Sequence, residues 1–400
     1  MTERPFWSRR IVEAWKRRPV VWLSGVRRVG KTTLARMLDP ATFLNCDLPS
    51  VGRRLADPES FFADVDPAGP VVFDEIHRLE DPSGVLKIAA DEHPRLRVLA
   101  TGSSTLTATR KFRDSLAGRK SAVYLPPILW SECRREFRIK NLDRRLLHGG
   151  LPEPLLAREK DPAFFSEWID SYYARDIQEL FRVRNRVGFM RLFKLLLMQS
   201  GGMADFSSLA KQSELSRPTV MAHVEALSVA HAIFLVSPFA GGGRREIVRR
   251  PKVYGFDTGF VTFVKGWDSI REDDRGLLWE HLVLDELRAR VDERPIGYWR
   301  DKSGRELDFV VRRPQGAVEV YECKVNPDNF DPEGLKVFRS QYPKGKNFVA
   351  APWIEIPYDR RYGDVTVTCG TPADLLSAAR PARTRSRARP GRSRRTAGRS

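Results

Sequence analysis

The sequence lacks any uninterrupted apolar run of the roughly 18 residues that a membrane-spanning helix requires. Its first stretch, MTERPFWSRRIVEAWKRRP, carries charges where a secretion signal would have its apolar centre. Cysteine is scarce, and the four that occur lie far apart with no CxxC pair: Cys46, Cys133, Cys323 and Cys369. This spacing argues against a zinc cluster or a disulfide framework and favours reduced thiols. These absences predict a soluble, cytoplasmic protein with no membrane partner.

Acidic residues are outnumbered, with 51 Asp and Glu against 69 Lys and Arg, which gives a formal net charge of +18. Half of this excess is in residues 380–400, which contain nine arginines and no acid. Such a Pro/Ser/Arg-rich segment cannot bury enough apolar surface to fold, and its charge attracts polyanions without sequence preference. The segment is therefore either a solvated tail of little functional consequence or a nucleic-acid-binding arm.

The stretch PVVWLSGVRRVGKTTLARMLDP combines an apolar run, a glycine-bounded loop and a helix. From Gly25 to Thr32 the loop matches G-x-x-x-x-G-K-[ST] at every fixed position. Glycine permits the turn, while backbone N–H groups and the helix N-terminus face the phosphates. Lys31 would reach the β- and γ-phosphates, and Thr32 would bind Mg²⁺. The pattern predicts an ATP site that includes Gly25, Gly30, Lys31, Thr32 and Thr33.

A second element of the same kind of site follows in GPVVFDEIHR, a predicted buried strand that ends in Asp74 and Glu75. This is the form of a Walker B segment, in which Asp74 would hold Mg²⁺ through water and Glu75 would orient the attacking water. A third predicted strand, RLRVLATGSS, ends in hydroxyl residues. Ser103 or Ser104 would either sense the γ-phosphate or cap the next helix.

The middle of the chain is helical, and DFSSLAKQSELSRPTVMAHVEALSVAHAIFLVSPFAGGGRREIVRRPKVYGFD predicts helix, turn, helix and then a hairpin. This order is typical of a winged helix-turn-helix, with Ser216 capping the second helix. Its exposed face and wing would carry Arg217, Thr219, His223, Arg244, Arg245, Arg249 and Arg250. These side chains either contact DNA phosphates and a groove, or belong to a rigid lid or protein-contact module.

Charged residues interrupt two apolar strands predicted in RELDFVVRRPQGAVEVYECK, which contains Asp308, Glu322 and Lys324. A half-buried charge is costly unless it is paired or holds a metal. Glu280 stands among apolar neighbours in the predicted helix GLLWEHLVLDELRAR. A helix with Glu, a strand with Asp and an antiparallel strand with Glu-x-Lys is the order of a restriction-endonuclease-like core, whose carboxylates bind Mg²⁺ while the lysine serves the hydrolytic water. The alternative is a Lys324 salt bridge in a fold that does not cut.

These motifs, together with LAGRKSAVYLPPILWSE, LHGGLPEP and YYARDIQEL, occur in the order found in one known family. Over about residues 6–350 the chain resembles the prokaryotic AAA-superfamily ATPases fused to a C-terminal domain of unknown function. The resemblance implies a restriction-endonuclease-like C-terminal core and self-association through the ATPase domain. It further implies that an arginine completes the ATP site in trans. Arg119 of AGRK is the candidate, with a plain surface role as its alternative.

The expected fold class is α/β, with a P-loop domain of the AAA type, a helical region with a winged helix, and a small α+β nuclease-like domain. The predicted boundaries are residues 1–137, 138–250 and 251–370, with a disordered Arg-rich tail over 371–400. The expected function is hydrolysis of ATP with Mg²⁺, used as a conformational switch that acts on DNA. Two alternatives stand beside it: a nucleotide-dependent scaffold or signalling switch with a protein partner, and a DNA-binding transcription regulator.

Overall fold

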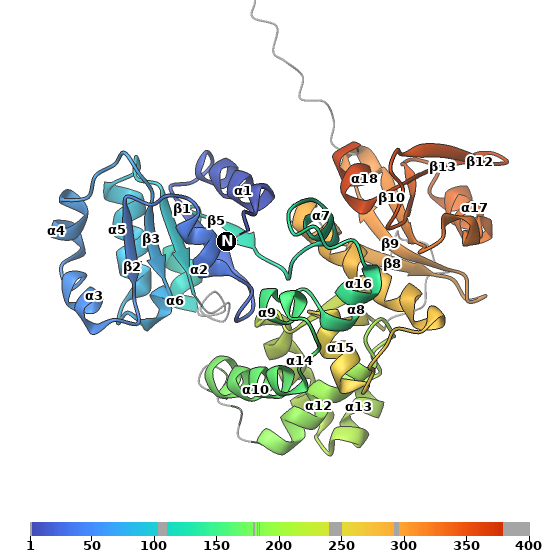
Figure 1. The fold of residues 1–400 in the computed structure, drawn as a ribbon, viewed down its shortest axis with the longest axis horizontal. Coiled ribbons are helices and arrows are strands. Elements are labelled where there is room, and N and C mark those ends of the chain that lie inside the picture. The colour runs from blue at the N-terminus through green and yellow to red at the C-terminus, as the bar shows by residue number, and fades with distance from the viewer. Residues whose placement is uncertain are drawn as a thin grey trace, which may run out of the picture.

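The computed structural model describes residues 2–102, 110–178, 181, 183, 185–239, 250–291 and 296–378. Figure 1 shows a parallel sheet with its helices on one side of the molecule, a large second sheet on the other, and a group of helices linking them. Three sets of residues with predicted roles lie outside the described residues. They are Ser103 and Ser104, the wing arginines Arg244, Arg245 and Arg249, and residues 379–400 of the predicted tail over 371–400. The prediction of disorder is wrong for the first part of that tail, because Pro372–Ala378 form a helix.

The first sheet has five parallel strands in the order β2-β3-β4-β1-β5. Their bounds are β1 Val20–Ser24, β2 Thr42–Asn45, β3 Val71–Asp74, β4 Val98–Thr101 and β5 Lys120–Tyr124. Every residue of β1, β3 and β4 is buried, as expected for central parallel strands covered on both faces. The predicted α/β fold with a parallel sheet is confirmed, and all the carboxyl ends of its strands meet at one edge.

Helices cover both faces of this sheet. Alternate residues of β1 divide between two apolar cores, with Val21 and Leu23 in one and Val20 and Trp22 in the other. The helix α1, Pro5–Trp15, packs into the first core, and α5, Pro82–Glu92, packs into the second. The remaining helices of this part are α2 Lys31–Arg36, α3 Pro49–Arg54, α4 Pro58–Ala63 and α6 Arg110–Ser115. The sheet edge that carries the motifs is thereby held by a packed frame.

The middle of the chain is helical, as predicted. It contains α7 Trp130–Arg135, α8 Leu142–His148, α9 Pro152–Leu156, α10 Pro162–Tyr172, α12 Arg186–Met198, α13 Phe206–Ser213 and α14 Arg217–Val229. A π-helical turn, Tyr173–Gln178, directly follows α10. After α14 the strands β6, Ile233–Pro238, and β7, Lys252–Gly255, pair antiparallel.

The second sheet has eight strands in the order β12-β13-β11-β10-β9-β8-β6-β7. Its other strands are β8 Ile296–Arg300, β9 Glu306–Arg312, β10 Val318–Cys323, β11 Asn347–Ala350, β12 Tyr358–Tyr362 and β13 Val365–Gly370. The strands β9 and β10 are antiparallel neighbours, as their sequence predicts. The accompanying helices are α15 Thr258–Val264, α16 Glu272–Arg290, α17 Glu333–Gln341 and α18 Pro372–Ala378.

The hairpin of β6 and β7 belongs to this second sheet, because Ser237 and Pro238 of β6 pair in parallel with Gly297 and Tyr298 of β8. The predicted domain boundary at residue 250 therefore falls inside one sheet and separates two paired strands. One apolar core also contains Leu23 of the first sheet, Trp168 of α10 and Trp279 of α16. No helix among the described residues is both long and apolar enough to cross a membrane.

Candidate functional site

The backbone conformation of the loop between β1 and α2 depends on glycine at two positions. Gly25 has a φ of 154°, and a Cβ added there would lie 2.5 Å from the Leu125 carbonyl oxygen. Gly30 precedes α2 in the left-handed region, with a φ of 98°. L-residues rarely adopt either conformation, so the loop depends on glycine at both places. It turns tightly over the end of β1, with its backbone leading into the first turn of α2, where Thr33 lies.

Lys31 begins α2 and is buried beneath this loop. Its Nζ donates hydrogen bonds to the carbonyl oxygens of Gly25, at 3.0 Å, and Val26, at 3.2 Å. Burial lowers the pKa of Lys31, while the nearby carboxylates of Glu75 and Asp176 raise it. The ammonium is thus held inside the loop by neutral acceptors, and a phosphate oxygen is a stronger acceptor than a carbonyl.

Asp74, the last residue of β3, joins polar groups from neighbouring elements at the same edge. Thr32 Oγ1 donates to Asp74 Oδ2 at 2.8 Å, and Thr101 Oγ1 of β4 donates to Asp74 Oδ1 at 2.6 Å. The Thr101 hydroxyl also accepts the backbone N–H of Glu75 at 3.1 Å. The hydroxyl of Thr32 and the carboxylate of Asp74 are oxygen donors of the kind that Mg²⁺ prefers, so this pair fits the ion.

Glu75 follows in a left-handed backbone conformation, with φ 55° and ψ 42°. Such a conformation is unfavourable for a residue with a side chain and concentrates at functional sites. Burial raises the pKa of Glu75, and the Lys31 ammonium opposes the rise. One carboxylate oxygen, Oε2, lies 3.2 Å from Nδ1 of His77. Gly25, Lys31, Glu75 and His77 together line one pocket of about 90 Å³.

The same pocket is lined by Arg175 and Asp176 of the π-helical turn. Asp176 lies 3.8 Å from Arg27 in the loop. The Arg27 guanidinium donates to the carbonyl of Ser171, and the Trp168 indole N–H donates to the carbonyl of Arg27. The middle of the chain is therefore held over the loop and supplies part of its pocket.

Sequence reasoning missed these residues for different reasons. Thr101 ends the strand in RLRVLATGSS, but the pattern favours Ser103 and Ser104 as the hydroxyl groups near the phosphates, and both lie outside the described residues. Arg175 and Asp176 belong to YYARDIQEL, a motif that carries only a resemblance to a family. They are far from Lys31 along the chain, so no local sequence pattern connects them with it.

Arg119 lies away from this pocket. It immediately precedes β5, and Lys120 at the start of β5 pairs with Val20 at the start of β1, so Arg119 is at the opposite edge of the sheet from the loop. Its guanidinium binds both carboxylate oxygens of Asp91, at 2.6 and 3.0 Å. Within one chain Arg119 does not reach the pocket, and a role in a neighbouring subunit's site stays a prediction.

The second group of predicted residues lies at α16, β9 and β10. The backbone N–H of Cys323 donates to Asp308 Oδ2 at 2.7 Å, and Lys324 Nζ is 3.3 Å from Glu322 Oε2. Burial raises the pKa of Glu280 and of Glu322, and the charge of Asp308 raises both further. Asp308 is thus close enough to each of the two glutamates to repel it.

Two residues of β7 that sequence reasoning missed complete this cluster. Lys252 is buried and pairs with Glu306 and with Glu280, whose Oε2 lies 3.6 Å from its Nζ. Tyr254 donates its hydroxyl to Glu280 Oε2 at 2.9 Å. Burial alone would lower the pKa of Lys252, but the Glu280 and Glu306 carboxylates hold it above its ordinary value. Ammonium groups therefore supply positive charge where the sequence predicts a metal ion.

Within the described residues, no group of three or more His, Cys, Asp or Glu side chains has an arrangement that could hold a metal ion. One oxygen of the cluster nevertheless lacks a partner, since Glu322 Oε1 is buried without a hydrogen bond. The four cysteines, including Cys323 beside this cluster, are all buried and free.

The predicted contacts of α14 are only partly on its exposed face. Ser216 caps the helix by accepting the N–H of Thr219, as predicted, and its hydroxyl also contacts the Thr219 hydroxyl at 2.7 Å. Arg217 is exposed. His223 instead packs its half-buried ring against Phe189 at 5.3 Å, because α14 turns that side toward α12. The expectation that His223 faces outward is therefore wrong. Arg250, the one wing arginine described, pairs with Asp205 at 3.0 Å.

Comparison with known proteins identifies the first part of the chain. A family model described as an AAA domain matches residues 17–134. Two further models match residues 139–271 (DUF8612) and 275–368 (DUF4143), and each is described as a domain of unknown function. The loop, Asp74 and Glu75 thus lie within the AAA match. The carboxylates of the cluster lie within the match to residues 275–368, while Lys252 and Tyr254 lie within the match to residues 139–271.

The chain is 31% identical over 331 residues to the uncharacterized proteins Rv2008c of Mycobacterium tuberculosis and Mb2031c of Mycobacterium bovis, spanning 79% of this chain and 73% of each relative. Among solved structures, the Walker-type ATPase PABY2304 of Pyrococcus abyssi has a TM-score of 0.43 and 20% identity, over 66% of this chain and 96% of that one. A signal transduction ATPase with numerous domains from Pyrococcus horikoshii has a TM-score of 0.28 and 12% identity, over 73% and 46%.

Proposed function

Since the chain belongs to the family of AAA-domain proteins that includes the two mycobacterial relatives, we propose that it binds ATP and hydrolyses it with Mg²⁺ as a conformational switch. The observation that carries the proposal is the hydrogen bond between Thr32 and Asp74, which joins the loop to the acidic strand end. It brings the phosphate-binding and the Mg²⁺-binding elements to one edge of the sheet.

Each residue of the site has a separate role in this reaction. Lys31 exchanges its carbonyl acceptors for the β- and γ-phosphate oxygens, while the loop N–H groups bind the phosphates. Thr32 and Asp74 would hold Mg²⁺, Asp74 through water, and the ion would supply positive charge at the phosphates. Glu75 orients the attacking water, and its contact with His77 keeps the carboxylate at the pocket wall. The backbone N–H groups are fixed before ATP arrives, which favours the transition state.

The test separates binding from hydrolysis. Lys31→Ala removes the main positive charge at the phosphates and should abolish ATP turnover and weaken ATP binding at least tenfold. Glu75→Gln leaves the phosphate contacts intact, so it should bind ATP but turn it over about 100-fold more slowly. Filter binding of labelled ATP and phosphate release measure the two effects. Turnover by Lys31→Ala at the wild-type rate would show that this loop is not the site.

We further propose that the switch acts on DNA. The helices α13 and α14 followed by the hairpin of β6 and β7 follow the order of a winged helix. Arg217 on the exposed start of α14, with the arginines of the wing and of the C-terminal segment, would contact phosphates. Of the two competing functions, a scaffold would use the same surfaces to bind a protein, and a DNA-binding transcription regulator would use them to bind DNA without the switch acting on it. On the described exposed face of α14, Arg217 is accompanied by Met221 and Glu225, and the Glu225 carboxylate would repel DNA phosphates there.

Removal of residues 380–400 tests the source of any DNA affinity. If these nine arginines bind phosphates, truncation should flatten the slope of log affinity against log salt by about one unit for each phosphate that is no longer neutralised. Fluorescence anisotropy with a labelled duplex at several salt concentrations measures the slope. An unchanged slope would assign DNA binding to the winged helix, and no binding at any salt would favour the protein scaffold.

A metal-dependent nuclease site at Glu280, Asp308 and Glu322 is a second candidate function, favoured by the buried, unpartnered Glu322 Oε1. It requires the three side chains to move from their present arrangement, which does not hold a metal ion. Mn²⁺ without nucleotide should raise the melting temperature of the full chain, and Glu322→Gln should remove that gain while leaving any gain from the ATP site. Lys324→Ala should stop metal-dependent cutting of DNA but keep the thermal gain, since the lysine serves the water. Equal gains in wild type and Glu322→Gln would favour a lysine-paired cluster without metal.

A further inference from the structure

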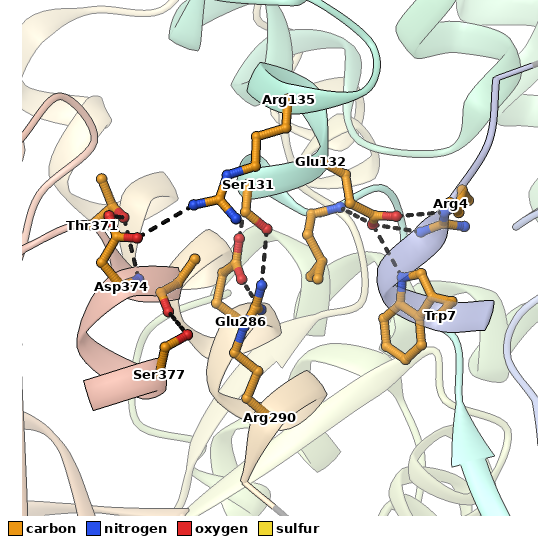
Figure 2. A network of polar contacts seen from close by, with 12 residues as sticks. Arg4, Trp7, Ser131, Glu132, Arg135, Glu286, Arg290, Thr371, Asp374 and Ser377 are labelled. Carbon is orange, nitrogen blue, oxygen red and sulfur yellow. Dashed lines mark hydrogen bonds and ion pairs between the residues drawn. The ribbon is translucent and has the colours of Figure 1, made fainter. Parts of the chain in front are cut away.

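A cavity of about 490 Å³, separate from the ATP pocket, lies where α7, the start of α18 and the loop after β11 meet. Figure 2 shows part of its wall, with Ser131 and Arg135 on α7, Glu286 on α16, and Thr371 and Asp374 at α18. Trp130, Arg134, Lys140 and Trp353 also line it. Its volume falls within the roughly 300–1,000 Å³ typical of small-ligand sites, and no residue of the proposed ATP or nuclease sites lines it.

The cavity presents a tryptophan on a fixed support. Trp353 is 46% exposed, and its ring contacts the buried Trp130 edge-on, with centroids 5.2 Å apart. The indole N–H of Trp130 and the guanidinium of Arg134 both donate to the carbonyl of Pro352, at 3.3 and 3.1 Å. The loop before Trp353 is therefore tied to α7, so the indole remains exposed at a defined place.

Two of the acids around the cavity are already paired, so they do not compete with a ligand for the cations at its wall. Asp374 is paired with Arg135 at 3.3 Å and accepts the Thr371 hydroxyl. Glu286 is buried, paired with Arg290, and accepts the N–H of Ser131 at 2.8 Å. These two acids are therefore neutralised, as Figure 2 illustrates.

Arg134 and Lys140 remain at the wall and face one exposed acid, Glu355. The first residues of α18 line the wall, the helix ends at Ala378, and the segment with nine arginines begins at residue 380. A polyanion drawn to that segment is thereby brought next to the cavity.

We propose that this cavity binds single-stranded nucleic acid, with an unpaired base against Trp353 and the adjoining phosphates at Arg134 and Lys140. An aromatic side chain beside cations is the combination that holds unpaired strands, because every base has a flat face and every link a negative charge. A duplex does not fit, since its bases are stacked and paired and offer no free face. The site is independent of ATP hydrolysis and goes beyond the DNA contacts assigned to the winged helix.

The test must separate the base from the phosphates, because the arginine segment binds any polyanion. The probes are a labelled 15-mer of dT and an abasic 15-mer with the same backbone, each titrated with the full chain. Wild type should prefer dT about tenfold, and Trp353→Ala should lose that preference, because one base stacked on an aromatic ring contributes about this much. Affinity for the abasic strand should stay the same in both.

Ile356→Ala is the matched control, because Ile356 is 79% exposed on the same loop but does not line the cavity. It should keep the preference for dT. Trp353→Phe retains an aromatic face and should keep part of the preference, which separates loss of stacking from local disorder.

Equal affinity of wild type for dT and abasic strands, or a full preference in Trp353→Ala, would overturn the proposal and favour a protein partner for this cavity. A Lys31→Ala chain should keep the preference, so failure of the ATPase proposal would leave this result untouched.

Discussion

At the scale of single residues, buried polar groups are kept in one protonation state by their partners. His281 on α16 is almost fully buried. Its Nδ1–H donates to the Leu277 carbonyl at 2.9 Å, and its Nε2 accepts the hydroxyl of Ser200 at 2.6 Å. That hydroxyl oxygen in turn accepts the N–H of Gly255 at 2.7 Å. This chain of hydrogen bonds fits a neutral imidazole, and it joins α16 to β7.

Acid should therefore destabilise the protein through His281. Burial lowers its pKa to about 4, from 6.5 in an unfolded chain. The stabilisation is complete above pH 6.5 and is lost as the pH falls from 6.5 toward 4, because only the unfolded state takes up the proton there. The loss is about 3 kcal/mol. Urea unfolding of wild type and His281→Gln at pH 7 and pH 4.5 measures the difference. Parallel losses in both proteins would assign acid sensitivity to other groups.

At the scale of elements, the π-helical turn after α10 is the part of the middle region that reaches the ATP pocket. π-turns insert an extra residue into a helix and occur often at functional sites. Here the turn directs Arg175 and Asp176 into the pocket that contains Lys31. Asp176 is also close to Arg27 of the loop. A change in the phosphate contacts would therefore act directly on α10 and on the helices behind it.

Arg175→Ala should lower ATP turnover at least tenfold, because a guanidinium that lines the pocket stabilises negative charge on the phosphates. Arg186→Ala is the matched control, since Arg186 pairs on the surface with Asp170 at 2.8 Å and both side chains are 60% exposed. Phosphate release and ATP binding should be measured for both variants. Equal rates in the two would exclude Arg175 from the reaction.

At the scale of the whole molecule, polar contacts around a buried carboxylate connect the ATP loop, through α7, to α16. Glu132 on α7 accepts two hydrogen bonds from Arg4, at 2.8 and 2.7 Å, and one from the Trp7 indole at 3.2 Å. Arg4 also donates to the carbonyl of Val29 in the loop. The preceding residue of α7, Ser131, is held by Glu286 and Arg290 of α16 (Figure 2).

Glu132→Gln should reduce the free energy of unfolding by about 3 kcal/mol, because it leaves the Arg4 charge buried without its counter-charge. It should also weaken ATP binding, since Arg4 supports the loop. Glu13→Gln removes an exposed pair with Lys16 and should change stability by about 0.5 kcal/mol or less. Urea unfolding and ATP titration of the two variants provide the comparison. A Glu132→Gln protein as stable as Glu13→Gln would contradict a structural role for this carboxylate.

The sequence predicted the parts of the site that depend only on short segments of the chain. Gly25 to Thr32 and Asp74 to Glu75 are local patterns, and parallel strands bring their ends together without further information. It could not predict contacts made by distant segments. Lys252 reaches Glu280 because β7 joins the second sheet, and Arg175 lines the same pocket as Lys31 because α10 packs over the loop. His223 was misplaced because helix periodicity does not reveal which neighbour, here α12, covers a given side.

The pairing of β6 with β8 affects how the chain folds as a ribosome makes it. Ser237 and Pro238 leave the ribosome well before Gly297 and Tyr298, with which they pair. At about 5–20 residues per second, this end of β6 waits several seconds with one edge open. Open strand edges associate with other chains, so slow translation between residues 239 and 296 should promote aggregation of nascent chains. The same holds for any fragment that ends before β8, which makes residues 296–300 the minimum C-terminal limit for expressing the middle region.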